Sequence, residues 1–433
     1  MKMIKDIFIK KLMYIFVLKD LLELLHNYPY SQKTLKLQNK RLRKIMKHCY
    51  KIPFYRQKFE SVGLTPEDIK TEKDLYKFPL TTKQELRDWI NGEVRKNPDK
   101  YKEWWKDSTS GSTGMPLNMY YSPRDRATNM AIWIHASVVN GGNPFLDVTG
   151  CVANPATVNN NQGLLQKIGL LRRYMVSYSD PVENMIEMIN KYKPDFFYAN
   201  RSQFVQMAMY AEKNNIKIHK PKICASAAEK MDKQSRRIIN EYFGNGLYDT
   251  YGCTESGMLA FQLKEKENEY QIHHDTHIVH VLDSENKPAK KGRAILTSLY
   301  HYGFPIINYD VGDGLDTFID EKSGLMKIRE INGRISDWIT LCDDSKITWQ
   351  EIETIMKTKD FLQQFRFVQE SKMELKLLLV PRADYQIDKK EAEMILKDEL
   401  EKLTKQKVKL IFEWKDELKP DANGKLRSIV SKL

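Results

Sequence analysis

The sequence predicts two domains, a large α/β domain over residues 1–336 and a small α+β domain over residues 337–433. Its 433 residues are 41% hydrophobic, which is enough to bury a sizeable core and favours two domains. Between Asp180 and Lys217, helical patterns alternate with a buried strand pattern, which is typical of parallel α/β layers. After Ile339, short strand and helix patterns alternate again, and this second run indicates a domain of its own.

The first 50 residues are predicted to form a helical extension, and the segment from Met1 to Asn27 predicts an amphipathic helix. Charged residues interrupt its apolar positions, so no window provides the roughly 20 mainly apolar residues that a bilayer span needs. The segment also lacks the small-residue cleavage site of a signal peptide. Such a helix can pack on the protein body, or it can attach peripherally to an anionic membrane surface.

Strand and helix patterns follow in order along the rest of the chain. In the large domain they predict strands 101–107 and 117–121, helix 181–192, strand 195–199, helix 202–214 with Ser202 as its N-cap, and strands 278–282 and 293–299. In the small domain they predict helix 348–357, strands 365–368 and 375–380, helix 388–404 and strand 407–412.

Charge and cysteine content narrow the class of protein. The formal net charge of +13 suits polyanionic ligands, but the lysines are scattered, so nucleic-acid binding is not expected. The 5 cysteines show no paired spacing, which argues against disulfides and zinc and fits a reducing cytoplasm. His273, His274 and His277 lie in a strand-rich region, where neighbouring side chains alternate between faces instead of converging on a metal.

The loop from Ser108 to Pro116 alternates hydroxyl side chains with glycines between two predicted strands. Glycine permits sharp bends, and such a loop offers backbone N–H groups and hydroxyls to phosphate oxygens. It lacks the lysine of the usual NTPase phosphate loop. Taken alone, the pattern fits either an ordinary hairpin or a phosphate site.

Four later motifs complete a recognisable series: Tyr251–Glu255, Tyr309–Asp313 in a turn-like region, Gly333–Ile339 and Gly424–Arg427. Together with the Ser108–Pro116 loop, they resemble in order the core motifs of the adenylate-forming superfamily. That superfamily contains acyl-CoA synthetases, nonribosomal adenylation domains and luciferases. The opening segments Ile52–Tyr55, Gly63–Pro66 and Phe78–Lys83 resemble the phenylacetate–CoA ligase-like branch and, more closely, its capsular polysaccharide biosynthesis (CapK-type) members.

The resemblance implies an ATP-dependent ligase that uses Mg²⁺ to make an acyl-adenylate from a carboxylic acid, with release of pyrophosphate. The acyl group would pass to coenzyme A, an amine or a carrier protein, in the service of surface polysaccharide biosynthesis. Catalysis is assigned to Lys425, Glu255 and Thr254, with Glu255 as the Mg²⁺ ligand. The residues implied for the phosphate loop are Thr109, Ser110, Gly111, Ser112, Thr113 and Gly114.

The same resemblance implies how the nucleoside is held and how the domains move. Tyr251 would stack on adenine, and Asp313 would accept both ribose hydroxyls. Asp337 matches the hinge about which the small domain rotates and withdraws its lysine. Beyond the loop, the full implied set for binding ATP is Glu229, Tyr251, Gly252, Thr254, Asp313, Arg334 and Lys425, with Thr254 reaching the α-phosphate.

Three departures from the family pattern bear on substrate and activity. Asn308 stands where arginine is common, so one positive charge near the phosphates is missing. Ala227 and Ala228 stand where glycines usually let the backbone approach the purine. The segment Ala153–Gly163, expected to line the acyl pocket, is polar, which favours an amino or hydroxy acid over phenylacetate.

Alternatives to this interpretation remain open. The chain could be a phenylacetate-type aryl-CoA ligase, or a catalytically silent member that acts as a binding subunit. The retained Lys425 and Glu255 count against silence, whereas Asn308 leaves room for it. Coenzyme A phosphates would need basic residues between the domains, and Arg172 and Arg173 are candidates, although no compact cluster singles them out.

Overall fold

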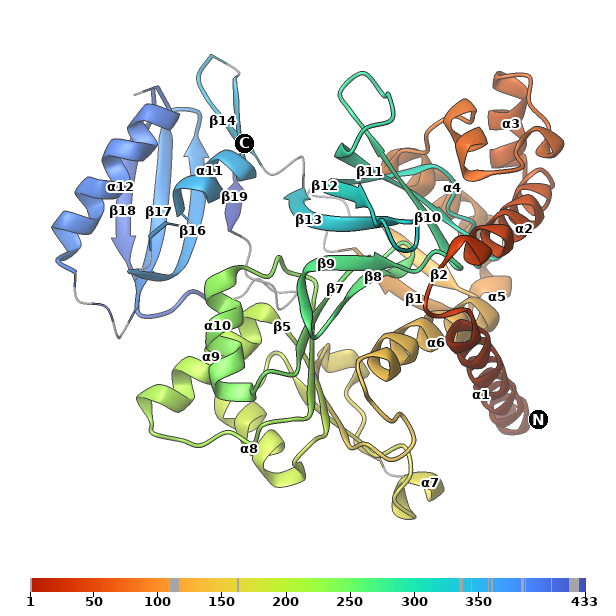
Figure 1. Ribbon diagram of the computed structural model, residues 1–433, viewed down its shortest axis with the longest axis horizontal. Helices are drawn as coiled ribbons and strands as arrows, with labels where there is room; N and C mark the ends of the chain where they lie inside the picture. Colours follow the sequence, from red (N-terminus) through yellow and green to blue (C-terminus); the bar gives the residue numbers. More distant parts are fainter. Residues whose placement is uncertain are drawn as a thin grey trace.

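The computed structural model describes residues 2–109, 117–161, 163–334, 338–343, 345–356, 358–359, 361–382, 385, 387–405, 407–419 and 428–433. Its centre is an 11-stranded mixed sheet in the order β10-β11-β12-β13-β9-β8-β7-β6-β5-β3-β4 (Figure 1). Strand β7 joins the two halves, because it pairs parallel with β6 and antiparallel with β8. The strands are β3 (Thr149–Ala153), β4 (Arg173–Ser177), β5 (Phe196–Asn200), β6 (Ile223–Ala227), β7 (Leu247–Cys253), β8 (Gly257–Leu263), β9 (Lys266–Ile272), β10 (His277–Leu282), β11 (Lys291–Ser298), β12 (Tyr309–Ile319) and β13 (Met326–Arg334).

Helices cover both faces of the parallel half of this sheet. One face packs on α8 (Val182–Tyr192), α9 (Arg201–Lys213) and α10 (Lys233–Phe243). The other face packs on α6 (Pro123–Val139), with α1 (Lys2–Asn27) lying against α6. Because both faces are covered, β6 is buried along its whole length, as expected for a parallel strand between two helical layers.

The remaining elements of the large domain lie around the antiparallel half of the sheet. The helices α2 (Gln32–Cys49), α3 (Pro53–Ser61) and α4 (Lys83–Lys96) surround a second core with residues of β10 and the segment before β12. Strands β1 (Trp105–Ser108) and β2 (Asn118–Tyr121) form an antiparallel pair that brackets the glycine-rich loop. The short helix α5 (Pro98–Tyr101) precedes β1, whereas the short helix α7 (Leu164–Lys167) lies in the connection between β3 and β4 of the parallel half.

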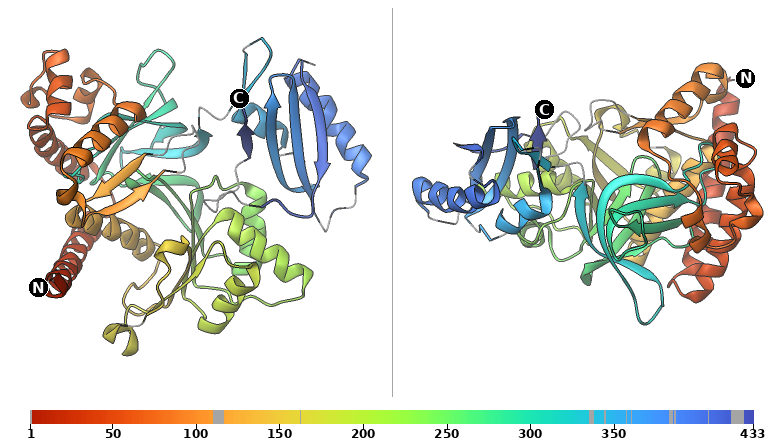
Figure 2. Two further views of the ribbon diagram at one scale, coloured as in Figure 1. Left: turned by 180° about the vertical axis from the view of Figure 1, so that it is seen from behind. Right: turned by 90° about the horizontal axis from the view of Figure 1, so that it is seen from above.

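The C-terminal part forms a separate 4-stranded sheet in the order β18-β17-β16-β19, with its own core (Figure 2). Its elements are β14 (Trp338–Thr340), β15 (Lys346–Thr348), α11 (Trp349–Met356), β16 (Leu362–Ser371), β17 (Glu374–Pro381), α12 (Lys389–Leu403), β18 (Lys409–Trp414) and β19 (Ile429–Ser431). The amide Nε2 of Gln234 on α10 donates to the Leu362 carbonyl at 2.7 Å, which joins this sheet to the large domain. Residues 335–337 lie outside the described residues, so the boundary at 336/337 stays a prediction.

The structure differs from the sequence-based prediction at three local points. The strand predicted at 101–107 begins only at Trp105, because Tyr101 ends helix α5. Helix α9 begins after Asn200, whose N–H donates to Gln203 Oε1 at 2.8 Å, so Ser202 is not the N-cap. The segment Tyr309–Asp313 is not a turn but the start of strand β12. Its extended conformation comes from pairing with β11 and β13, which a local pattern with two polar residues and a glycine does not reveal.

Candidate active site

A cleft of about 2250 Å³ opens between the central sheet and the C-terminal sheet. Its walls include the ends of β6 and β7, the start of β12, the face of α6, and residues of the C-terminal part such as Phe365. The sequence-predicted residues that line it are Thr109, Glu229, Tyr251, Gly252, Thr254, Glu255 and Asp313. Four segments that are distant in the sequence therefore meet in one cavity.

The Tyr251–Gly257 turn at the end of β7 needs both of its glycines. A Cβ atom on Gly252 would lie 2.4 Å from the Gly257 carbonyl oxygen, so no side chain fits there. Gly257 has a φ of +72°, and a Cβ atom there would lie 2.1 Å from Nδ2 of Asn129. The turn thus presents Thr254 and Glu255 to the cleft in one tightly packed conformation. Its backbone is further held by the Tyr121 hydroxyl, which donates to the Thr254 carbonyl.

Glu255 is a carboxylate that lines the cleft and is buried from solvent. It is 5% exposed, and its Oε1 accepts a hydrogen bond from the Tyr309 hydroxyl at 2.7 Å. A single carboxylate beside phosphate oxygens and water is the donor set that Mg²⁺ usually takes, so Glu255 fits the predicted ligand. Among the described residues no group of three or more His, Cys, Asp or Glu side chains is arranged to hold a metal by itself. The tyrosine partner was not predicted, although Tyr309 opens the same motif as Asp313.

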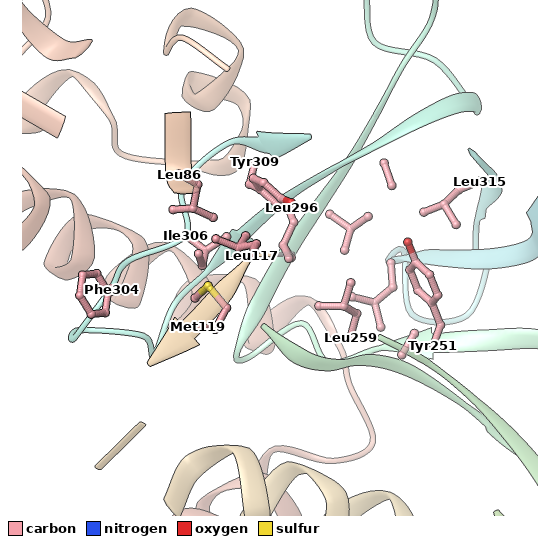
Figure 3. Close-up of a cluster of buried hydrophobic side chains, with 14 of the residues drawn as sticks. Leu86, Leu117, Met119, Tyr251, Leu259, Leu296, Phe304, Ile306, Tyr309 and Leu315 are labelled. Carbon is pink, nitrogen blue, oxygen red and sulfur yellow. The ribbon is translucent and has the colours of Figure 1, made fainter. Parts of the chain in front are cut away.

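Asp313 and Tyr251 form a second pair in the cleft. The Tyr251 hydroxyl donates to Asp313 Oδ2 at 2.9 Å. Burial, and then the charge of Asp313, raise the pKa of Tyr251 well above its ordinary value, so the hydroxyl stays a donor. The Tyr251 ring belongs to the hydrophobic core of the antiparallel half, as does that of Tyr309 (Figure 3). In the sheet, Asp313 lies directly opposite Arg334, which brings the two predicted ribose residues to the same register.

Glu229 lies just beyond β6 and is tied to the start of α9. Its Oε1 accepts from the Ser202 hydroxyl at 2.8 Å, and its Oε2 accepts from the Ser202 N–H at 2.9 Å. The Arg201 side chain pairs with the same carboxylate at 3.4 Å. These bonds hold the Glu229 side chain, which lines the cleft, against the start of α9.

The phosphate loop is described only at its two edges. The Thr109 N–H donates to the Leu117 carbonyl at 3.0 Å, and the Leu117 N–H donates to Thr109 Oγ1 at 2.9 Å. These two bonds pair Thr109 with Leu117, and so extend the β1–β2 pairing up to the loop. The predicted residues that lie outside the described residues are Ser110, Gly111, Ser112, Thr113, Gly114, Asp337 and Lys425.

Of the departures noted in the sequence, Asn308 has a structural explanation. Its buried amide Nδ2 donates to the carbonyls of Leu75 at 3.0 Å and Phe78 at 2.7 Å, and it does not line the cleft. Its φ of +51° also suits asparagine better than arginine. The side chain therefore anchors the N-terminal segment, and the expected loss of a positive charge near the phosphates stays a prediction.

The two other departures act at the cleft itself. Ala228 has a φ of +70°, the left-handed conformation that glycine adopts without strain. In the expected acyl segment, only Ala153 and Asn154 among its described residues line the cleft. The other described residues of that segment do not line this cleft, so their place in the acyl pocket stays a prediction.

The α6 wall was not anticipated from the sequence. Arg126, Asn129 and Trp133 line the cleft from this helix, and Trp133 meets Tyr198 of β5 edge to face with ring centroids 5.4 Å apart. Helical spacing of three and four residues is visible in the sequence, but only the packing of α6 shows which face points into the cavity.

Comparison with protein families gives two matches in separate parts of the chain. Residues 80–294 match the family of AMP-binding enzymes, and residues 340–432 match the CapK C-terminal domain. The first match contains the β1–β2 loop and the Tyr251–Gly257 turn. The second contains the C-terminal sheet.

Relatives and solved structures agree with these matches. The chain is 24% identical over 346 residues to a phenylacetate–coenzyme A ligase of Pseudomonas putida, covering 76% of each chain. It is 24% identical over 332 residues to the Escherichia coli enzyme of the same name, covering 74% of this chain and 76% of that one. In fold it resembles 2-hydroxyisobutyryl-CoA ligase in the postadenylation state, with a TM-score of 0.72, 19% identity, and 92% and 89% coverage.

The cleft residues from Thr109 to Glu255 lie within the AMP-binding match, and Asp313 lies between the two matches. The CapK match covers the C-terminal part, which contributes residues such as Phe365 to the same cleft. The chain therefore belongs to the adenylate-forming superfamily, as an AMP-forming ligase that is phenylacetate–CoA ligase-like and of the CapK type.

Proposed function

We propose that the protein activates a polar carboxylic acid with ATP–Mg²⁺ and transfers the acyl group to coenzyme A. The observation that carries this proposal is the convergence of Thr109, Glu229, Glu255 and Asp313 from distant segments in one cleft. Such a cleft brings two anions, the carboxylate and the triphosphate, into contact and holds them for reaction.

In the adenylation step, a carboxylate oxygen attacks the α-phosphorus of ATP, and the bond from that phosphorus to pyrophosphate breaks with its electron pair. The Thr254 hydroxyl would donate to the α-phosphate, and the loop after Thr109 would hold the β- and γ-phosphates. Mg²⁺ held by Glu255 would neutralise charge on the phosphates. Asp313, fixed by the Tyr251 hydroxyl, would accept the ribose hydroxyls, and Lys425 would bridge the attacking carboxylate and the phosphate.

In the transfer step, the acceptor thiolate attacks the acyl carbonyl carbon, and AMP leaves with the electrons of the acyl–phosphate bond. The phenylacetate–coenzyme A ligases and the 2-hydroxyisobutyryl-CoA ligase support coenzyme A as that acceptor. An amine or a carrier protein is the competing acceptor. The chain fits the postadenylation state of the hydroxyisobutyryl enzyme with a TM-score of 0.72 and its thioesterification state with 0.59. The proposal includes rotation of the small domain about Asp337 between the two steps, because the hydroxyisobutyryl enzyme has been solved in both states.

The setting proposed for this chemistry is surface polysaccharide biosynthesis at the cytoplasmic side of a membrane. The CapK C-terminal match supports the polysaccharide part. The acid is proposed to be polar because the cleft walls near α6 and β3 carry Asn129, Asn154 and Arg126 beside aromatic rings.

A pyrophosphate-release assay across a panel of carboxylic acids, with and without coenzyme A, tests the reaction. We expect release with polar acids and formation of a thioester when coenzyme A is present. Lys425→Ala should lower the rate roughly 10²- to 10³-fold, as for loss of one preorganised charge. Lys415→Ala is the matched control, because Lys415 is half-exposed and pairs with Glu413 at 2.9 Å.

The possible results of this assay distinguish the acceptor, the role of Lys425 and the alternative of a silent binding subunit. An adenylate that persists with coenzyme A but is consumed by an amine or a carrier protein would replace the acceptor and keep the adenylation. Wild-type rates in Lys425→Ala would remove that lysine from the site. No pyrophosphate release with any acid would favour the silent binding subunit.

The exposed face of helix α1 supports a second part of the proposal, namely peripheral contact with a membrane. Among the described residues no helix has the length and apolarity to cross a bilayer. One face of α1 packs on α6 through Val17, Leu21 and Leu24. Another face exposes large apolar side chains next to the exposed Lys19: Tyr14 (58%), Ile15 (63%), Leu18 (46%) and Leu22 (59%). An exposed apolar stripe with basic neighbours suits an anionic lipid surface.

Vesicle flotation tests this contact. The protein should float with vesicles that contain phosphatidylglycerol more than with neutral ones, and the double variant L18E/L22E should lose this. Met394→Glu, an exposed apolar site on α12, is the control. Dimers that disappear in L18E/L22E without any lipid binding would show a second copy of the chain on this face and overturn the membrane proposal.

A further inference from the structure

The α6 wall carries a cation that lies outside all the adenylation motifs. Arg126, Asn129 and Trp133 line the cleft and lie on one face of α6. The neighbouring positions Ala127 and Ala131 are fully buried in the core instead. The helix therefore presents a guanidinium, an amide and an indole to the space in which the substrates meet.

Arg126 differs from the other shielded cations of the large-domain wall in its surroundings. Among the residues that the structure describes, no carboxylate lies within 4 Å of its guanidinium. The comparable cations each have one: Arg201 with Asp232 at 2.6 Å, Lys230 with Glu330 at 3.1 Å, and Arg236 with Glu267 at 3.8 Å.

The guanidinium is held in place by a ring and is poorly hydrated. Its Cζ lies 4.5 Å from the centroid of the Trp105 ring, a cation–π contact that covers one of its faces. Burial lowers the pKa of Arg126, and Asp107 and Tyr121 act on it only at longer range. An arginine stays charged even so, and a shielded cation without a counter-ion is stabilised when an anion binds.

We propose that Arg126 is a substrate-binding residue that takes an oxyanion, namely a carboxylate or a phosphate. Two substrates would bring such an oxyanion into the cleft: the carboxylic acid, through a second acidic group, and ATP, through its triphosphate. The first source deepens the proposed function, on which it rests, because it makes the preferred substrate an acid with two anionic groups. The second source makes Arg126 an additional phosphate ligand next to the β1–β2 loop.

Binding measurements separate these sources without requiring turnover. Isothermal titration calorimetry would use inorganic pyrophosphate, and dicarboxylates of three to five carbons against monocarboxylates of equal length. The variants are Arg126→Met, which keeps the length without the charge, and Arg126→Lys, which keeps the charge. Arg124→Gln is the matched control, because Arg124 lies on the same helix but pairs with Asp20 of α1, away from the cleft.

Arg126→Met should weaken the binding of one of the two anions, the dicarboxylate or pyrophosphate, about 10- to 100-fold, which corresponds to the loss of a charge-assisted hydrogen bond. The affinity for monocarboxylates should stay unchanged. Arg126→Lys should keep part of the affinity, and Arg124→Gln all of it. A loss confined to dicarboxylates assigns the acid, and a loss confined to pyrophosphate assigns the triphosphate.

The proposal and the proposed function fail in different ways. If wild-type protein binds neither class of anion, or if Arg126→Met binds both like the wild type, the proposal for Arg126 is overturned. If Arg126 controls anion binding but no acid gives pyrophosphate release, the proposed function fails and the oxyanion site stands.

Discussion

His135 provides a test of how burial sets the acid stability of the large domain. This side chain on α6 is fully buried among Tyr28, Tyr30, Phe261 and His273, with both ring nitrogens unpartnered among the described residues. Burial lowers the pKa of His135 to about 4, from an ordinary value of 6.5. The perturbation is His135→Leu, which keeps a similar volume and removes the titrating group.

The direction in which pH changes the free energy of unfolding follows from which state, folded or unfolded, binds the proton at higher pH. Below pH 6.5 the unfolded chain protonates His135, whereas the folded protein does not until about pH 4. Its contribution to stability is therefore present above pH 6.5 and is lost as the pH falls through 4. At pH 5 the loss is about 2 kcal/mol, and below pH 4 it approaches roughly 3.4 kcal/mol, from 1.36 kcal/mol for each pKa unit.

Other buried groups titrate in the same range, so a single pH curve does not isolate His135. Burial lowers the pKa of His274 and His280 to about 4, which adds to the loss. Burial raises the pKa of Asp249 and Asp275 to about 6. These carboxyls contribute stability that is fully present below their unfolded pKa and lost as pH rises through 6, so they oppose the histidines.

The assay is urea unfolding followed by tryptophan fluorescence at pH 7.5 and pH 5.0, for wild type and for His135→Leu. The stability lost between the two pH values should be smaller in the variant by about 2 kcal/mol, whatever the direct cost of the substitution. His26→Gln, at an exposed position near the end of α1, should leave the difference unchanged. An equal loss in His135→Leu and wild type would refute the reasoning.

Four further substitutions test the site and the residues that support it. Glu255→Gln should raise the Mg²⁺ concentration for half-maximal turnover about 10-fold or more, while the melting temperature stays near that of wild type; an unchanged Mg²⁺ titration would remove Glu255 from the metal site. Ala228→Gly should stabilise the protein by about 1 kcal/mol by relieving its left-handed backbone, whereas Ala227→Gly in β6 should destabilise it by about 0.5 to 1 kcal/mol. The same sign in both urea titrations would contradict this. Asn308→Ala should cost about 2 to 3 kcal/mol by leaving two buried carbonyls without donors; a loss of adenylation with no loss of stability would return position 308 to the active site.

The elements with clear periodicity were predicted well from the sequence. The helix predicted at 388–404 is α12 over Lys389–Leu403, and the strand predicted at 278–282 is β10 over His277–Leu282. Such patterns depend on which positions are apolar, and this is a local property of the chain. The start of α9 was misplaced, because Asn200 and Ser202 are both good caps. In the structure Asn200 forms the cap with Gln203, and the Ser202 hydroxyl donates to Glu229 instead.

By itself, the sequence determined the order of the motifs, and with it the class of enzyme. A motif such as Tyr251–Glu255 can be read locally because it encodes a turn, in which no side chain fits at Gly252 or at the following Gly257. Tertiary structure alone decided that Tyr309 binds Glu255, that Asn308 bonds to the N-terminal segment, and that Arg126 lines the cleft. These contacts join residues up to 233 positions apart in the case of Asn308 and Leu75. They depend on how whole helices and strands pack against one another, and no local pattern of residue types specifies that packing.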